Sequence, residues 1–195
     1  MRVDADLQFL QYCDNEELRT LCDILTFDNN GKIRFCDSLS KSANYQSYYP
    51  RNMVGMWKDL ACEVQCYGGN SLCNLFRNGQ GPSYEQIVYD VCKRMNIKDI
   101  CKYDSAEDME QKFLLAVARK AIDELSEDDI RAIMNECYIH VVGAGAMTRG
   151  AALLRPSLGC DIMGPAYHVT IPAVIQVAYM RLKYQAKLKT NSACA

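Results

Sequence analysis

The feature that most constrains the fold of this chain is the spacing of its apolar residues, which recur every three or four positions through residues 1–137. This period places apolar side chains on one face of an α-helix. Two stretches show it most clearly, with apolar positions Leu18, Leu21, Cys22 and Leu25 in the first and Tyr84, Ile87, Val88, Val91, Cys92 and Met95 in the second. The sequence therefore predicts a mainly α protein, an antiparallel multi-helix domain with short connections.

Signals for helix starts and stops support this prediction. Asp14 with Glu17, and Ser83 with Gln86, have the spacing of a capping box, in which each side chain bonds the other residue's backbone N–H. A further apolar stripe runs from Met53 to Tyr67 and contains Trp57, which we expect to anchor the core. The sequence also predicts a short helix before Asp14, one after Asp104-Ser105, and others at 71–76 and 126–137.

The chain changes character after Cys137. Residues 1–137 carry 16 basic and 23 acidic side chains, whereas residues 138–195 carry six basic and one acidic. The second part also holds five of the eleven glycines. We therefore divide the chain into a helical domain, 1–137, and a glycine-rich, basic and apolar C-terminal segment, 138–195.

Two structures remain open for this C-terminal appendage. The β-branched runs 138–142 and 167–171 favour a short β-hairpin. From Pro172 onward the pattern favours an amphipathic helix, whose apolar face is expected to hold Ile171, Val174, Ile175, Ala178 and Leu182, with Gln176, Lys183 and Lys187 opposite.

Residues 162–180 form a stretch of nineteen positions without a charged side chain, followed by Arg181. A helix of this length nearly crosses a bilayer of roughly 30 Å. Polar residues and prolines dilute the stretch, so three interpretations remain: packing on the domain or on a partner, contact with a membrane surface, and spanning.

Eleven cysteines, an odd number, indicate a reducing compartment, and the first residues show no secretory signal. We therefore expect a cytoplasmic protein with reduced cysteines. The formal net charge of −2 gives no global field that would attract nucleic acid.

Several residues are candidates for sites of chemistry. Gly143 and Gly145 follow an apolar run as in a nucleotide-binding turn, but too few strand–helix units surround them. Cys62, Cys66 and Cys73 lack the paired spacing of a zinc site. His168 stands in an uncharged stretch where a structural role is commoner than acid–base catalysis. We expect no catalytic residue, cofactor or metal, and keep a nucleotide- or metal-dependent enzyme as a third hypothesis.

Three blocks carry a family resemblance: DLQFLQYCDNEELRTLCDILT (6–26), YGGNSLCNLFRNG followed by YEQIVYDVCKRMNI (67–97), and AYHVTIPAVIQVAYMR (166–181). Together they resemble a family of uncharacterised bacterial proteins grouped with the mitochondrial ubiquinol-cytochrome c chaperones. The resemblance implies a non-enzymatic helical protein that engages other proteins near membranes.

These observations favour a protein-interaction or chaperone-like assembly factor in the cytoplasm near the inner membrane, with a membrane protein among its candidate clients. By block membership, the partner-binding candidates are Gly68, Gly69, Asn70, Arg77, Tyr167, His168, Thr170 and Pro172. The alternative is a membrane-associating protein that anchors or inserts through residues 138–180.

Overall fold

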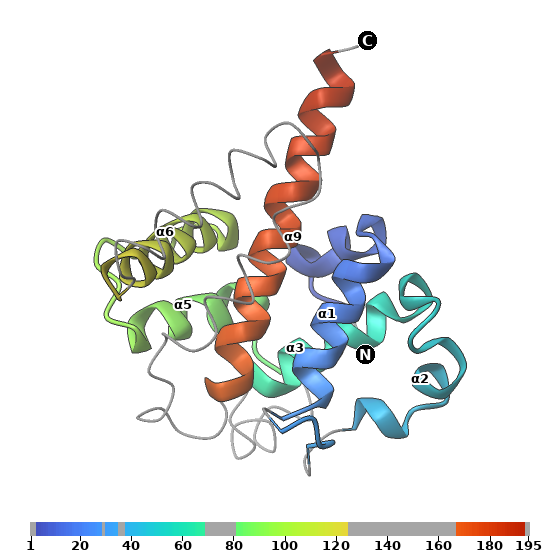
Figure 1. Ribbon diagram of the computed structural model, residues 1–195. Helices are drawn as coiled ribbons and strands as arrows, with labels where there is room; N and C mark the ends of the chain where they lie inside the picture. Colours follow the sequence, from blue (N-terminus) through green and yellow to red (C-terminus); the bar gives the residue numbers. More distant parts are fainter. Residues whose placement is uncertain (1–2, 29, 35–37, 69–80, 125–166, 194–195) are drawn as a thin grey trace.

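The computed structural model describes residues 3–28, 30–34, 38–68, 81–124 and 167–193 (Figure 1). Their elements are, in chain order, the 3-10 helix η1 (Ala5–Tyr12), α1 (Asn15–Thr26), η2 (Leu39–Lys41), α2 (Ala43–Tyr48), η3 (Met53–Met56), α3 (Trp57–Gly68), α5 (Tyr84–Arg94), α6 (Ala106–Glu124) and α9 (Tyr167–Ala193). Within these ranges β pairing amounts to one isolated antiparallel bridge, between Phe27 and Ile33. The prediction of a mainly α fold is confirmed.

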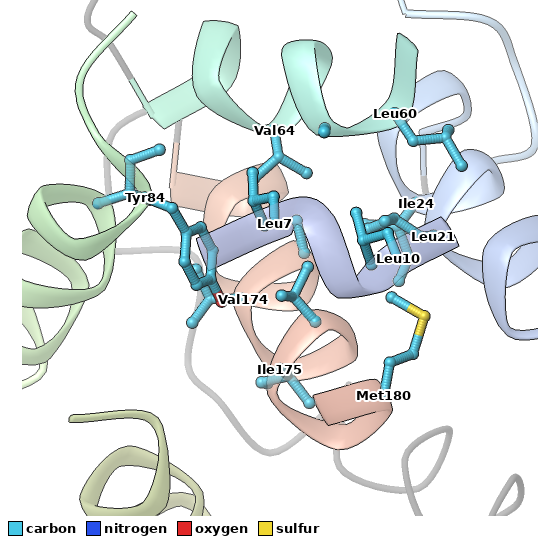
Figure 2. Close-up of a cluster of buried hydrophobic side chains, with 14 of the residues drawn as sticks. Leu7, Leu10, Leu21, Ile24, Leu60, Val64, Tyr84, Val174, Ile175 and Met180 are labelled. Atoms are coloured by element: carbon cyan, nitrogen blue, oxygen red, sulfur yellow. The ribbon is translucent and has the colours of Figure 1, made fainter. Parts of the chain in front are cut away.

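The C-terminal helix α9 runs through the middle of the other helices and packs on η1, α1, α3, α5 and α6 (Figure 1). Between Val169 and Met180 its side chains are buried, except for the partly exposed Pro172 and Tyr179. Figure 2 shows Val174, Ile175 and Met180 in the same cluster as apolar side chains of η1, α1 and α3. This part of the C-terminal segment is therefore at the centre of the fold.

The start of α9 differs from expectation. Residues 167–171 are helical and do not form a strand, and the helix continues through Pro172. Proline supplies no N–H to the helix, and β-branched residues prefer strands. Here Val169 and Ile171 are 2% and 0% exposed, and burial of their side chains outweighs these local preferences.

The expected one-sided pattern of α9 is also wrong in detail. Gln176, placed on the polar face by its sequence position, is buried, and its Nε2 donates to the backbone oxygen of Glu17 at 3.1 Å. Leu182, placed on the apolar face, is exposed. The first half of α9 is surrounded by other helices, so periodicity on a single helix does not define its inside and outside.

The start of α1 confirms the predicted capping box. Asp14 Oδ1 accepts from the Glu17 backbone N–H at 3.0 Å, and Glu17 Oε2 accepts from the Asp14 N–H at 3.0 Å. At α5 half of the predicted box forms. Ser83 accepts from the Gln86 N–H, but the Gln86 side chain donates to Asp90.

The predicted apolar faces of α1 and α5 are buried, except that Met95 lies just after α5 and is half-buried. The inward positions Met109, Phe113 and Val117 of α6 are buried as well. Trp57 is different: it begins α3, is partly exposed, and packs against the edge of the core. The predicted helices at 71–76 and 126–137, the run 138–142, the glycine turn at 143–145 and the proposed domain boundary at Cys137 lie outside the described residues.

Candidate functional site

Four of the five partner-binding candidates in described residues, Gly68, Tyr167, His168 and Thr170, lie where the end of α3 meets the start of α9. Thr170 Oγ1 donates to the backbone oxygen of Tyr67 at 3.2 Å, across 103 positions of sequence. This bond holds the first turn of α9 beside the last turn of α3. We call this place the α3–α9 junction and define it by Tyr67, Gly68, Tyr167, His168 and Thr170. Gly69, Asn70 and Arg77 lie outside the described residues.

Gly68 has a packing role at this junction. A Cβ built on it would lie 2.3 Å from Cγ1 of Ile87, which is itself 1% exposed. Gly81 likewise lies so close to the Gln65 backbone that a Cβ would be 2.6 Å from its carbonyl oxygen. Glycine at these positions lets α3 approach the chain at and after Gly81, so close packing is the physical reason for both glycines.

The exposed part of the junction is aromatic and basic. Thr170 is buried, whereas Tyr167 and His168 are half-buried at the start of α9. The guanidinium of the exposed Arg94 lies 5.5 Å from the Tyr167 ring centroid, within the range of a cation–π contact. Pro172 is one turn further along α9 and half-buried. These groups can offer a partner a flat ring, a guanidinium and an imidazole.

A second polar cluster, missed by sequence reasoning, lies inside the fold. Arg181 Nε lies 2.6 Å from Glu110 Oε2, and Tyr84 donates its hydroxyl to Glu110 Oε1 at 2.6 Å. Arg181 also donates to the backbone oxygen of Asp6 at 2.7 Å, and its guanidinium lies 4.3 Å from the Phe9 ring centroid. One arginine of α9 therefore connects η1, α5 and α6.

Burial dominates the electrostatics of this cluster. Desolvation raises the pKa of Glu110 although Arg181 and Tyr84 oppose the shift, and it raises the pKa of Tyr84 well above its ordinary value. Desolvation disfavours the charge on Arg181, but the charge and hydrogen bond of Glu110 outweigh it and raise the pKa of Arg181. The Arg181 and Glu110 side chains are only 12% and 3% exposed, so this cluster fixes helices and presents little surface to a ligand.

Lys183 extends the contact between α9 and the N-terminal residues. Its ammonium lies 2.9 Å from Asp14 Oδ2 and 2.5 Å from Glu17 Oε1, the two residues of the capping box. Together with the hydrogen bond from Gln176 to the Glu17 backbone oxygen, these ion pairs attach α9 to the first turn of α1. The only sequence signal was the position of Arg181 and Lys183 directly after the uncharged stretch.

Cys13, Cys62, Cys92 and Cys101 are free thiols. Cys13, Cys22 and Cys92 are buried, and burial raises the pKa of Cys13 to about 12 and of Cys92 to about 11. Cys62 and Cys66 are partly exposed, and burial raises their pKa values as well. Within the described ranges no three metal-ligating side chains gather into a site. Cys73, the third cysteine of the candidate zinc set with Cys62 and Cys66, lies outside the described residues.

Among the described helices, none combines the length and apolar character needed to cross a membrane. The fold and the junction thus define a class: an α-helical protein assembled around a C-terminal helix.

Comparison with known proteins makes this class more specific. Residues 1–35 match a domain of unknown function, DUF3944. The chain is 28% identical to the UPF0174 protein YaaW of Escherichia coli over 225 aligned positions, which cover 91% of this chain and 94% of that protein. It is 25% identical to a UPF0174 protein of Helicobacter pylori, covering 94% and 93%. No solved structure matches the chain.

The chain is thus similar over nearly its whole length to uncharacterised UPF0174 proteins such as YaaW, and its first 35 residues match DUF3944. The expected resemblance to an uncharacterised bacterial family is therefore supported. A link to the ubiquinol-cytochrome c chaperones is not shown. The described part of the DUF3944 region is η1, α1 and the bridge at Phe27, and Arg181, Lys183 and Gln176 of α9 bind it directly.

Proposed function

We propose that this protein is a non-enzymatic interaction or assembly factor that binds another protein at the α3–α9 junction, in the cytoplasm near the inner membrane. The observation that supports the proposal most is the Thr170–Tyr67 hydrogen bond. It joins two of the sequence blocks that supply the partner-binding candidates. A membrane protein is one candidate for this client, as the resemblance to assembly chaperones implies.

The chemistry of the junction also supports binding of a protein. Tyrosine and arginine are enriched at protein interfaces, where a rigid ring and a planar guanidinium bury area at small entropic cost. Tyr167 and Arg94 supply this pair, with His168 beside them. The buried face of α9 beneath them provides a rigid support, so little ordering is needed on binding.

The alternative functions receive less support. Membrane insertion through residues 138–180 requires apolar side chains facing lipid, but Ile171, Val174 and Val177 pack against protein. Catalysis by a cysteine requires a thiolate near neutral pH, whereas burial raises the pKa of Cys13, Cys62, Cys66 and Cys92.

Site-specific photo-crosslinking in cells tests the proposal. The full chain would carry a photoreactive phenylalanine analogue at position 168 or, as control, at Tyr103, which is 93% exposed in the α5–α6 connection. We expect one discrete protein to be crosslinked from position 168 and not from position 103. Thermal melting of each variant verifies that the fold is intact.

A charge reversal gives the matched comparison. Arg94→Glu removes the cation beside Tyr167 and is expected to reduce the crosslink from position 168 severalfold. Lys93→Glu makes the same charge reversal at the neighbouring exposed position, and we expect it to leave the crosslink from position 168 unchanged. The proposal fails if no protein is crosslinked at position 168, or if the same proteins appear from position 103.

A further inference from the structure

Arg94 is the last residue of α5, and its exposed side chain has no carboxylate within ion-pair distance among the described residues. Its guanidinium lies 5.5 Å from the centroid of the Tyr167 ring. A cation–π contact of this kind is made with the face of the ring and does not consume the N–H donors of the guanidinium. Arg94 is therefore held at the α3–α9 junction with its donors available.

Asp90 is the expected partner of Arg94, because it lies four positions earlier on the same helix. At this spacing an acid that precedes a base forms a favourable pair. In the structure, however, Asp90 Oδ1 accepts from Gln86 Nε2 at 2.7 Å. These three residues lie on successive turns of α5, so the Gln86 amide binds the Asp90 carboxylate from the turn opposite to that of Arg94.

The same bond explains why the predicted capping box at the start of α5 forms only in part. Ser83 accepts from the Gln86 N–H at 3.3 Å, but the Gln86 side chain is directed toward Asp90. The amide thus engages the acidic side chain that lies one turn from Arg94. The consequence is an arginine without an ion pair inside its own helix.

The facing helix does not supply an acid to Arg94 either. The 27 residues of α9 include no aspartate or glutamate. The neighbouring cation, Lys93, is directed elsewhere: its Nζ lies 5.5 Å from the Tyr89 ring centroid, and consecutive residues of a helix point about 100° apart. Arg94 is therefore the cation of α5 that lies at Tyr167.

We propose that the partner bound at the α3–α9 junction presents an aspartate or glutamate carboxylate to Arg94, and that Gln86 is a positioning residue that keeps Arg94 from pairing with Asp90. This inference rests on the proposed function and specifies the chemistry of the partner. A carboxylate matches a guanidinium because two parallel N–H···O bonds join them. The Tyr167 ring restricts the arginine before binding, which reduces the entropic cost of the contact.

Variants of the full chain that carries the photoreactive analogue at position 168 test the role of Arg94. Arg94→Gln is expected to lower the crosslink yield about fivefold, the upper end for a solvent-exposed ion pair. Arg94→Lys keeps the charge but loses the paired donors, so its yield should be intermediate. Thermal melting of each variant verifies that the fold is intact.

Gln86→Ala tests the positioning role. It releases Asp90 to pair with Arg94 and is expected to lower the crosslink yield about twofold, the equivalent of one ion pair at this helical spacing. Adding Asp90→Asn removes the competing charge and should restore the yield, which a merely structural effect of Gln86 would not do. Gln111→Ala on α6 is the matched control, since Gln111 Nε2 also donates to an acid one turn earlier, Glu107, at 3.5 Å.

A charge exchange with the partner is the decisive experiment. Mass spectrometry of the crosslinked peptide identifies the partner segment, and its acidic residues nearest the crosslink are changed one at a time to lysine. One of these changes should lower the crosslink yield about fivefold with wild-type Arg94, and Arg94→Glu should restore it with that partner variant.

The possible outcomes separate this inference from the proposed function. A discrete crosslink that is unaffected by Arg94→Gln, or that no charge exchange restores, would overturn the carboxylate contact and leave the junction as a binding site. Failure of Asp90→Asn to restore the Gln86→Ala variant, or an equal loss in Gln111→Ala, would overturn the role of Gln86. Absence of any discrete crosslink from position 168 would overturn both the inference and the proposed function.

Discussion

Arg181 and Glu110 form a buried ion pair, with Nε and Oε2 2.6 Å apart, between two helices whose residues are separated by 71 positions of sequence. The tyrosine hydroxyl of Tyr84 donates to the same carboxylate, and Arg181 donates to the Asp6 carbonyl. The pair therefore joins the C-terminal helix to α5, α6 and the beginning of the chain at one point. This arrangement makes the fold sensitive to removal of either charge.

Removal of Arg181 alone is expected to lower the free energy of unfolding more than replacement of the whole cluster of Tyr84, Glu110 and Arg181. Arg181→Met leaves the Glu110 carboxylate buried without its cation and should lower the free energy of unfolding by about 3–5 kcal/mol. The triple variant Arg181→Met/Glu110→Leu/Tyr84→Phe replaces every member by an apolar group and should recover much of this loss. Urea unfolding measures the free energy of unfolding of the single and triple variants. A loss in the triple variant equal to the sum of the losses from the three single changes would contradict the prediction.

Lys183 is expected to stabilise the start of α1. Lys183→Gln removes the ammonium next to the Glu17 carboxylate, which is 3% exposed, and should cost about 1–2 kcal/mol because Lys183 itself is partly solvated. Lys187→Gln, one turn further along, should change stability by less than about 0.5 kcal/mol. Thermal or urea unfolding of the two variants side by side provides the comparison.

The effect of Lys183→Gln should depend on pH. Burial alone would raise the pKa of Asp14, but hydrogen bonds from the Glu17 N–H and Lys183 hold it below the ordinary value of 3.8. A carboxylate with a lowered pKa in the folded state contributes stability that is present above 3.8 and lost as the pH falls below it. The difference between wild type and variant should therefore shrink in acid; a constant difference would exclude a contribution from Asp14.

Gly68 is expected to tolerate no side chain. Gly68→Ala normally favours a helix, but the new Cβ would overlap Ile87 and should destabilise the protein by about 1–3 kcal/mol. Ile87→Ala opens space at the same point, so the double variant should be more stable than the sum of the two single effects. Additive losses would show that the junction relaxes around the methyl group by another route.

The buried Tyr84 hydroxyl predicts a loss of stability in alkali. Burial and the adjacent Glu110 raise the pKa of Tyr84 well above 10, so the folded protein keeps this proton while the unfolded chain releases it. The free energy of unfolding should therefore fall as the pH rises past about 10. Tyr84→Phe should be less stable by about 1 kcal/mol at neutral pH and show a shallower alkaline decline; an unchanged slope would argue against this assignment.

Sequence patterns predicted the local structure well where the signal depends on near neighbours. The capping box of Asp14 and Glu17 and the buried faces of α1 and α5 involve residues within one or two turns. The same reasoning failed at Gln86, whose amide Nε2 donates to the Asp90 carboxylate one turn further along α5, while its side chain does not accept from the Ser83 N–H. At Trp57 it was right in part: the ring packs against the core but stays partly exposed, because amino-acid type alone does not decide how deeply a large ring is buried.

The candidate site was predicted only as a set of residues. Gly68 and Thr170 belong to separate sequence blocks, and nothing in either block indicates that Thr170 bonds the Tyr67 carbonyl. The cluster of Tyr84, Glu110 and Arg181 had no sequence signal beyond residue types that are ordinary at helix surfaces. Side chains of this kind acquire a role only when other helices exclude water from them.

The sequence by itself determined the mainly α character, the period of the helices and their caps, because these depend on contacts among residues at most a few positions apart. Only the tertiary structure decided that α9 is the central helix, that it continues through Pro172, and that Gln176 faces inward while Leu182 faces out. The physical reason is burial: α9 gains its stability from surfaces supplied by helices more than 40 residues away in sequence. No pattern within α9 encodes where those surfaces will lie.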